Sequence, residues 1–112
     1  MSTSQALTVG VITKDAGDDL PGLLESLPPE VELVVADGGS EDETVQLSRE
    51  AGAIVIEQDQ EAIRLAGGNF DVARNGIIRI ATSDWILFLD ADERLTVECR
   101  EEISAVLSDR PS

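Results

Sequence analysis

The sequence is short of several residue types, and each shortage narrows what the chain can be. It has a single cysteine, Cys99, so no disulfide can form within the chain, which fits a reducing cytoplasm. No apolar run approaches the ~20 residues that a membrane-spanning helix needs. Residues 1–5 lack the basic-then-apolar order of a secretory signal. With two Phe, one Trp and no Tyr, the core has to be built from Val, Ile, Leu and Ala. We therefore expect a cytoplasmic protein.

Positive charge is also scarce. The 112 residues carry eight Lys and Arg against 23 Asp and Glu, which gives a net charge of −15, and Lys14 is the single lysine. Such a surface would repel nucleic acid and anionic lipid, so we expect neither to bind directly. The excess of acids favours a solvated surface adapted to high salt. At 1 M salt the Debye length falls to ~3 Å, so the repulsion between the acidic side chains is screened. A halophilic source is the expectation.

Apolar runs alternate with segments of helical spacing, which is typical of βαβ units. The length suits one domain over residues 1–112. Apolar runs predict strands at residues 7–13, 33–36, 53–56 and 85–89. Helical spacing predicts helices at residues 18–27, from a capping box at Ser40 to about 52, from 69 or 71 to 81, and at 96–107. Residues 57–68 are predicted to be a loop with a helical turn at 62–65. With right-handed crossovers, this order predicts an α/β protein with a Rossmann-like, three-layer α/β/α fold and a mainly parallel sheet.

Polar clusters follow three of the predicted strands. They are Thr13-Lys14-Asp15, Asp37-Gly38-Gly39-Ser40 and Asp90-Ala91-Asp92-Glu93. Ligands of open parallel sheets bind beyond the carboxyl ends of the strands, so we expect the three clusters to meet at one edge.

Asp90 and Asp92 are candidate metal ligands. In an extended chain, residues i and i+2 project to the same side, so both carboxylates could face one ligand. Paired oxygen ligands suit Mg²⁺ or Mn²⁺, held jointly with substrate phosphates. The alternative is a polar turn that caps the next helix.

Asp37 and Arg74 each allow two interpretations. The Asp37 cluster is either a structural turn in which Ser40 caps a helix, or a ligand-binding loop whose glycines allow close approach of a ligand. Arg74 could bind a diphosphate, with Asn75 hydrogen-bonded to the loops at the sheet edge. Otherwise Arg74 is a solvated side chain and Asn75 a local cap.

Four segments, taken in order, resemble the opening half of family-2 glycosyltransferases, which have the GT-A fold. They are Leu7-Thr-Val-Gly-Val-Ile-Thr-Lys-Asp15, Val34-Val-Ala-Asp-Gly-Gly-Ser-Glu-Asp-Glu-Thr44, Phe70-Asp-Val-Ala-Arg-Asn75 and Asp84-Trp-Ile-Leu-Phe-Leu-Asp-Ala-Asp-Glu93. The likeness spans residues 7–107 and is strongest to the branch of lipopolysaccharide-core glucosyltransferases. It implies an inverting enzyme that binds a nucleotide-diphosphate sugar with Mn²⁺ or Mg²⁺ and transfers the sugar to an acceptor hydroxyl.

The resemblance also implies roles for the matching residues. Thr13 and Asp15 would lie against the base and ribose, and Asp37 would contact the base. Asp90 would approach the ribose or a metal-bound water, and Asp92 would bind the metal directly. Asp15 departs from the family, which more often has Asn there, but both side chains accept a hydrogen bond.

Arg74 would lie near the diphosphate. The catalytic base is expected beyond this chain, because family members continue with a further segment that supplies the acceptor site and a carboxylate base. A general base is worth about 10²–10⁴-fold in rate, so donor binding can persist where transfer fails. The alternative is a non-catalytic nucleotide-sugar-binding or assembly module that self-associates or joins a partner subunit. A nucleotidyltransferase is disfavoured, because no Gly-rich basic loop follows the first strand. Acceptors in this family are often lipid-linked, which would place the protein at the cytoplasmic membrane face.

Overall fold

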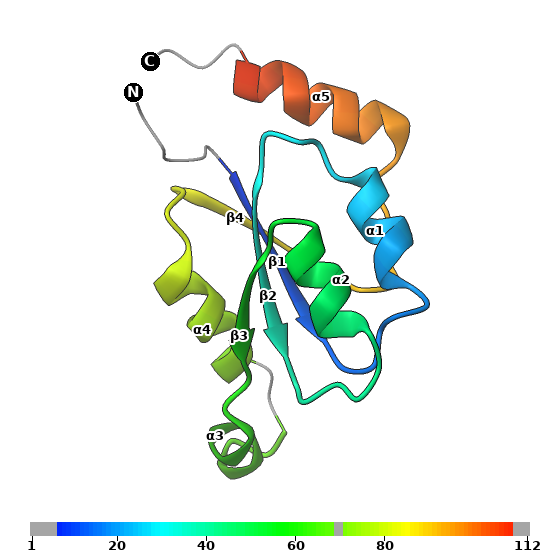
Figure 1. Cartoon of the computed structure of the whole chain (residues 1–112). Helices are drawn as coiled ribbons and strands as arrows, with labels where there is room; N and C mark the ends of the chain where they lie inside the picture. Colours follow the sequence, from blue (N-terminus) through cyan, green and yellow to red (C-terminus); the bar gives the residue numbers. More distant parts are fainter. Residues whose placement is uncertain (1–6, 69–70, 109–112) are drawn as a thin grey trace.

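The computed structural model describes residues 7–68 and 71–108, and a parallel β-sheet lies at its centre (Figure 1). Within these residues the sheet has the strand order β3-β2-β1-β4. The strands are β1 (Leu7–Thr13), β2 (Glu32–Asp37), β3 (Ile54–Glu57) and β4 (Trp85–Asp90). The helices are α1 (Leu20–Ser26), α2 (Thr44–Glu50), α3 (Gln60–Leu65), α4 (Asp71–Ile80) and α5 (Val97–Ser108). No helix in the described part of the chain is long and apolar enough to cross a membrane.

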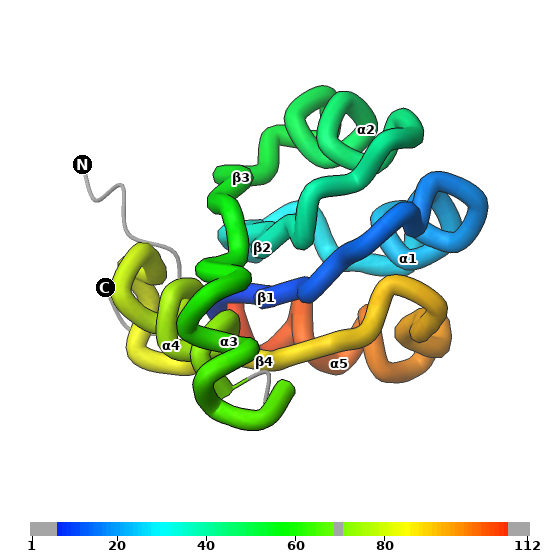
Figure 2. The backbone as a smooth tube through the Cα atoms, turned by 90° about the horizontal axis from the view of Figure 1, so that it is seen from below, coloured from blue at the N-terminus to red at the C-terminus, as the bar shows by residue number. Residues whose placement is uncertain are grey.

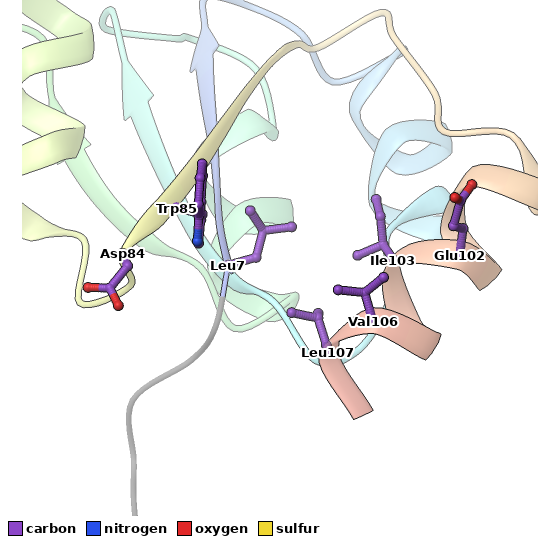
Figure 3. Close-up of a pocket in the computed structure, with 7 residues that line it drawn as sticks. All are labelled: Leu7, Asp84, Trp85, Glu102, Ile103, Val106 and Leu107. Carbon is purple, nitrogen blue, oxygen red and sulfur yellow. The ribbon is translucent and has the colours of Figure 1, made fainter. Parts of the chain in front are cut away.

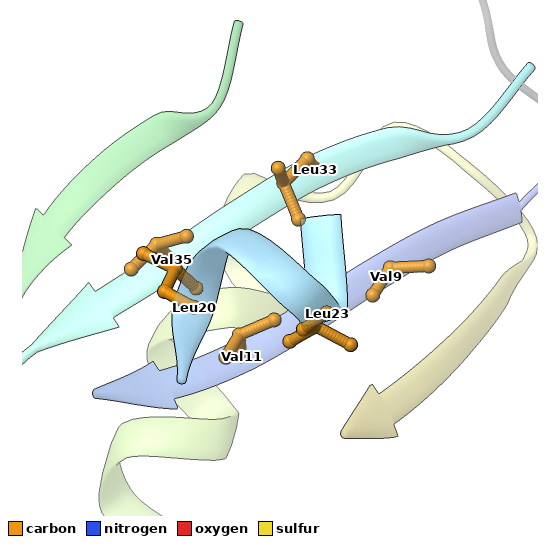
Figure 4. Packing of buried hydrophobic residues seen from close by; sticks show 6 residues of the cluster. All are labelled: Val9, Val11, Leu20, Leu23, Leu33 and Val35. Atoms are coloured by element: carbon orange, nitrogen blue, oxygen red, sulfur yellow. The ribbon is translucent and has the colours of Figure 1, made fainter. Parts of the chain in front are cut away.

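Helices cover both faces of the sheet, and this confirms the predicted three layers. Figure 2 shows α1, α2 and α5 on one side of the strands and α3 and α4 on the other. The central strands β1 and β2 are mostly buried and mainly apolar, as strands covered on both faces should be. The core on the α1 side contains Val9, Val11, Leu20, Leu23, Leu33 and Val35 (Figure 4).

A second core lies between the other face of the sheet and the pair α3 and α4. Its buried members are Val34, Ala36, Ile63, Ala73 and Ile77. Gly10, in the middle of β1, lets α4 approach closely. A Cβ at this position would lie 2.9 Å from Cγ2 of Ile77 and 3.0 Å from Cδ1 of Phe88.

The four predicted strands are confirmed to within one residue at each end. The predicted capping box is wrong, because the Ser40 hydroxyl bonds to Asp37 and α2 begins only at Thr44. The helical turn predicted at residues 62–65 within the loop over 57–68 is present, and it begins two residues earlier, as α3. The side chain of Asp59 caps this helix by accepting the N–H of Ala62 at 3.0 Å. The alternative helix start at residue 69 lies outside the described residues.

The edge at which the strands begin is held together by Glu32. Its carboxylate accepts the hydroxyl of Thr8 at 2.8 Å, and the N–H and hydroxyl of Thr82 at 2.9 Å each. Burial would raise the pKa of Glu32, but the hydrogen bonds from Thr82 and Thr8 outweigh burial and keep the pKa below its ordinary value of 4.5. Glu32 therefore links the start of β2 to the segment that leads into β4.

An apolar hollow of about 650 Å³ lies near the same edge, between the start of β4 and α5 (Figure 3). Its lining residues are Leu7, Asp84, Trp85, Glu102, Ile103, Val106 and Leu107. Trp85 is 71% exposed, and Val106 is 62% exposed. The hollow lies at the opposite end of β4 from Asp90, so it is separate from the predicted polar clusters.

Candidate functional site

The carboxyl ends of β1, β2 and β4 bring the three predicted polar clusters to one edge of the sheet. Thr13 lies beside Asp37 in the strand register, and Ile12 lies beside Asp90. In the sheet, β2 and β3 lie on one side of β1, and β4 lies on the other side. The crevice between β1 and β4 is therefore a topological switch point, the place where open α/β sheets bind ligands.

Asp37 accepts four hydrogen bonds from its own chain. Its Oδ1 accepts the hydroxyls of Thr13 at 2.7 Å and Ser40 at 2.6 Å. Its Oδ2 accepts the backbone N–H of Gly39 at 3.0 Å and of Ser40 at 2.8 Å. A carboxylate offers about four lone-pair sites, so Asp37 would reach a base only by exchanging one of these bonds. The structural turn is present, and the contact between Asp37 and a base stays a prediction.

The Asp37 carboxylate stays ionised although the residue is only 5% exposed. Burial would raise its pKa, but the hydrogen bonds from Ser40, Thr13 and Gly39 outweigh burial and hold the pKa below the ordinary value of 3.8. Hydrogen bonds to the charged form are the physical cause of this shift.

The loop after β1 is joined to the loop after β2. The N–H of Asp15 donates to Oγ of Ser40 at 2.7 Å, and the N–H of Glu41 donates to Oδ1 of Asp15 at 2.7 Å. Lys14 crosses the same gap, with Nζ donating to the carbonyl of Gly39 at 2.7 Å. Asp15 has a φ of 49°, a left-handed conformation that Asp and Asn tolerate better than most residues. The departure from Asn at this position is therefore compatible with the backbone.

A second carboxylate, Asp42, supports these loops and was missed in the sequence. Its Oδ1 accepts the N–H of Thr44 at 2.9 Å and also the Thr44 hydroxyl, and its Oδ2 accepts the N–H of Gly17 at 2.9 Å. The hydrogen bonds from Thr44 are the main cause that lowers the pKa of Asp42. Thr44 in turn accepts the N–H of Ala16 at 2.8 Å. An Asp two residues before a Thr at a helix start was the signal that could have revealed this contact.

The chain turns directly after Asp90, so the expected extended geometry of Asp90 and Asp92 is wrong. The N–H of Glu93 donates to the carbonyl of Asp90 at 2.9 Å, and Oε1 of Glu93 accepts the N–H of Asp90 at 2.7 Å. The polar turn is thus present, although Thr96 supplies the cap of α5 by accepting the N–H of Cys99 at 3.0 Å. The side chains of Asp90 and Asp92 are both exposed. Their role as metal ligands stays a prediction.

Arg94 ties this turn to α1. Its Nη1 donates to the carbonyl of Asp92 at 3.0 Å, and its Nη2 donates to the carbonyl of Asp19 at 3.2 Å. The guanidinium lies against Gly22, where any Cβ would collide with it. The backbone of Asp92 is therefore positioned while its carboxylate stays exposed. A single arginine after an acidic motif has no spacing pattern, so the sequence did not reveal this role.

Arg74 lies in the first turn of α4, where Nη1 is 3.0 Å from Oδ1 of Asp71. Its side chain is 44% exposed. Asn75 is exposed as well. This arrangement agrees with a solvated, locally paired arginine, and the predicted place of Arg74 beside a diphosphate is untested.

A hollow of about 350 Å³ opens beside the ends of β1 and β2, and its lining residues are Ile12, Thr13, Lys14, Gly38, Gln58 and Gln60. Nε2 of Gln58 donates to the carbonyls of Thr13 at 3.1 Å and Ala36 at 3.0 Å. Nε2 of Gln60 donates to the carbonyl of Gly38 at 3.0 Å. Sequence analysis missed both glutamines because residues 57–68 show no apolar periodicity.

Asp90 and Asp92 offer two exposed carboxylates to the implied metal. Within residues 7–68 and 71–108, no three Asp, Glu, Cys or His side chains gather as a metal cluster. Mg²⁺ keeps several waters and is usually held by one or two carboxylates together with substrate phosphates. Two exposed carboxylates beside the crevice between β1 and β4 fit such an ion where substrate phosphates complete its ligands.

Comparison with known proteins gives the family. Residues 8–111 match the model of "Glycosyl transferase family 2". The chain is 41% identical over 102 residues to a TPR repeat-containing protein of Synechococcus elongatus. It is 31% identical over 106 residues to the SPbeta prophage-derived glycosyltransferase SunS of Bacillus subtilis. The matches cover 90% and 94% of this chain but 24% of each relative, so the chain spans about a quarter of their length.

Solved structures share the fold. Staphylococcus aureus TarS in complex with UDP has a TM-score of 0.71 at 24% identity, over 94% of this chain and 32% of that chain. Glucosyl-3-phosphoglycerate synthase from Mycobacterium tuberculosis, in complex with Mn²⁺, UDP and glucosyl-3-phosphoglycerate, has a TM-score of 0.61 at 20% identity. That match covers 80% of this chain and 36% of the synthase. The Rossmann-like GT-A fold is thereby confirmed, and with a family model that matches almost its whole length, the chain belongs to glycosyl transferase family 2.

Proposed function

We propose that this chain is the part of an inverting glycosyltransferase that binds a nucleotide-diphosphate sugar together with Mn²⁺ or Mg²⁺. One observation carries the proposal: polar and acidic residues from the ends of β1, β2 and β4 meet at the switch point of a sheet that belongs to this family. The TarS structure contains UDP, and the mycobacterial synthase contains UDP and Mn²⁺, which supports the same class of ligand here.

Different residues of this edge bind different parts of the nucleotide-diphosphate sugar. Thr13 and Asp15 hold the nucleoside, Arg74 lies toward the diphosphate, and Asp92 with Asp90 holds the metal. When bound, the metal neutralises charge on the leaving nucleoside diphosphate. The acceptor hydroxyl attacks the anomeric carbon on the face opposite the leaving group, which gives inversion. The base that deprotonates this hydroxyl is not assigned to any residue of this chain.

The charge of the molecule supports a metal requirement. A diphosphate that approaches this edge meets the carboxylates of Asp15, Asp90 and Asp92 in a protein of net charge −15. Lys14 and Arg74 already lie against acids, with Nζ of Lys14 at 3.8 Å from Oδ2 of Asp15. These carboxylates repel the negatively charged diphosphate, so a divalent cation is needed for the diphosphate to bind at this edge.

The proposal is tested by calorimetric titration of UDP, GDP and their sugars in molar KCl, with and without Mn²⁺. Asp92→Ala is expected to lower metal-dependent affinity at least tenfold, about 1.4 kcal/mol, because one metal ligand is lost. Asp84→Ala is the matched control, since it removes the same charge from an exposed Asp just before the opposite end of β4. Affinity should be unchanged in this control.

Three outcomes of this titration would contradict or change the proposed function. Undiminished metal-dependent binding by Asp92→Ala would show that the metal lies elsewhere. If folded wild-type protein binds no nucleoside diphosphate, the proposal is rejected. Donor binding with neither transfer nor hydrolysis of the sugar would favour the non-catalytic binding module.

A further inference from the structure

We propose that Gln58 reads the nucleobase of the donor, with its Oε1 accepting a hydrogen bond from a ring N–H. This inference rests on the proposed function and deepens it. The bases with such an N–H are uracil and thymine, through N3, and guanine, through N1. Cytosine and adenine carry a lone pair at the corresponding position, so the site should reject both.

The orientation of the Gln58 amide is fixed by its neighbours. Nε2 donates to the carbonyls of Thr13 at 3.1 Å and Ala36 at 3.0 Å, and a carbonyl can only accept. The amide therefore cannot be flipped without placing Oε1 against two other oxygens. The backbone is held too, because the N–H of Gln58 donates to the carbonyl of Asp37 at 2.9 Å. The side chain is a rigid part of the sheet edge.

One acceptor of this rigid amide is unused. Gln58 is only 9% exposed, and its Oε1 accepts no hydrogen bond from the residues that the structure describes. Among the described residues, Ser83 Oγ is the fully buried side-chain polar atom that lacks a partner, so Oε1 of Gln58 is accessible from outside and a ligand N–H can reach it. Gln58 also lines the hollow of about 350 Å³ beside β1 and β2.

Gly38 lies close to the amide of Gln58. A Cβ at this position would lie 3.2 Å from Nε2 and 3.4 Å from Oε1 of Gln58. A larger residue would therefore crowd Nε2 of Gln58, whereas its contact with Oε1 would be an ordinary van der Waals contact.

The other groups of the hollow suit the same kind of base. Uracil and guanine both carry a carbonyl beside the ring N–H. Lys14 and Gln60 each use an N–H on a backbone carbonyl, of Gly39 and Gly38 respectively, and each has further hydrogens on the same nitrogen. Asp37, the acceptor that the family resemblance places at the base, already accepts four hydrogen bonds from Thr13, Gly39 and Ser40. Gln58 is thus the better placed acceptor.

The test compares nucleotides that differ in one hydrogen. UDP, GDP, CDP and ADP are titrated with Mn²⁺, followed by the N3-methyl form of UDP or the N1-methyl form of GDP, whichever parent binds more tightly. Wild-type protein should prefer the parent about tenfold over its methylated form and over CDP and ADP. In Gln58→Met the parent and the methylated form should bind equally. A preference that persists in the variant would overturn the inference, because another group would then be reading the base.

A measurement on the wild-type protein covers the case in which Gln58→Met does not fold. The side-chain carboxamide ¹³C resonance of Gln58 should shift when the parent nucleotide binds and stay in place with the methylated form. Equal shifts with both forms would contradict the inference. Binding without any preference for a ring N–H overturns this inference alone, whereas no binding of any nucleoside diphosphate overturns the proposed function as well.

Discussion

At the scale of single residues, the carboxylate of Asp37 connects the site to the fold. It joins β1, through Thr13, to the loop that follows β2, through Gly39 and Ser40. Hydrogen bonds to a charged group make a net contribution of about 1.5–3 kcal/mol each to stability. A residue placed at a strand end for ligand binding thereby also determines the shape of the loops around the ligand.

Asp37→Asn should therefore lower the free energy of unfolding by about 1–3 kcal/mol near neutral pH, because the amide keeps the shape but loses the charge. The folded-state pKa of Asp37 lies below the ordinary 3.8. Its contribution is then fully present above pH 3.8 and is lost as the pH falls through the folded-state value. Urea unfolding followed by circular dichroism should show the gap between wild type and variant closing in acid. A gap that stays constant with pH would contradict this assignment.

Glu32→Gln is the matched control at the opposite edge of the sheet. The pKa of Glu32 is also lowered, so its contribution to stability should fade in acid in the same way. Its partners are Thr8 and Thr82, far from the polar clusters. Nucleotide affinity should change in Asp37→Asn and stay the same in Glu32→Gln.

Single residues of the site were predictable only where strand ends mark them. Asp37 and Asp90 follow apolar strands, so the parallel topology alone brings them to one edge. Gln58 and Arg94 instead donate hydrogen bonds to backbone carbonyls of segments distant in the sequence, Gln58 to Thr13 and Arg94 to Asp19. Such contacts have no periodicity in the sequence, because any polar side chain of the right length can make them.

At the scale of elements, the strands were predictable and the starts of the short helices were not. A strand buried on both faces is typically a near-continuous apolar run, and β1 is close to one. The start of α2 depends on competition for one side chain: Ser40 could cap a helix, but the buried carboxylate of Asp37 binds its hydroxyl at 2.6 Å. Helix α3 has six residues, too few for a clear apolar stripe, and only the Asp59 cap marks its start.

The contact between β1 and α4 gives a prediction at this scale. Gly10→Ala should destabilise the fold by about 1–3 kcal/mol, because overpacking a filled core forces neighbours to move. The new Cβ would lie 2.9 Å from Cγ2 of Ile77 and within 3.1 Å of two ring carbons of Phe88. Denaturant unfolding measures the loss.

Gly76→Ala, in α4, is the control from the same helix, at a point where it faces β3. Its Cβ would meet Cδ1 of Ile56 at 3.4 Å, an ordinary van der Waals contact. Alanine is favoured over glycine inside a helix by about 1 kcal/mol, so this variant should be as stable as wild type or more stable. Equal losses in Gly10→Ala and Gly76→Ala would show that space at β1 is not the deciding factor.

At the scale of the whole molecule, the acids are largely without nearby cations. The ion pairs found in the described residues are local, namely Lys14 with Asp15, Arg64 with Glu61, and Arg74 with Asp71. Exposed pairs of this kind contribute about 0–1 kcal/mol each. They cannot offset the mutual repulsion that a net charge of −15 imposes on a compact chain.

Stability should therefore rise with salt. Raising KCl from about 0.1 M to about 1 M shortens the Debye length from about 10 Å to about 3 Å and screens the repulsion. We expect the melting temperature to rise by at least about 5 °C, which corresponds to about 1 kcal/mol for a domain of this size. A triple variant with Glu50, Glu101 and Glu102 changed to Gln tests the cause, since all three side chains are exposed. It should melt higher than wild type at low salt and respond less to KCl. If wild type is fully stable at low salt, or if both proteins respond equally to KCl, the acids are not the source of the salt dependence and the expectation of a halophilic protein loses its physical basis.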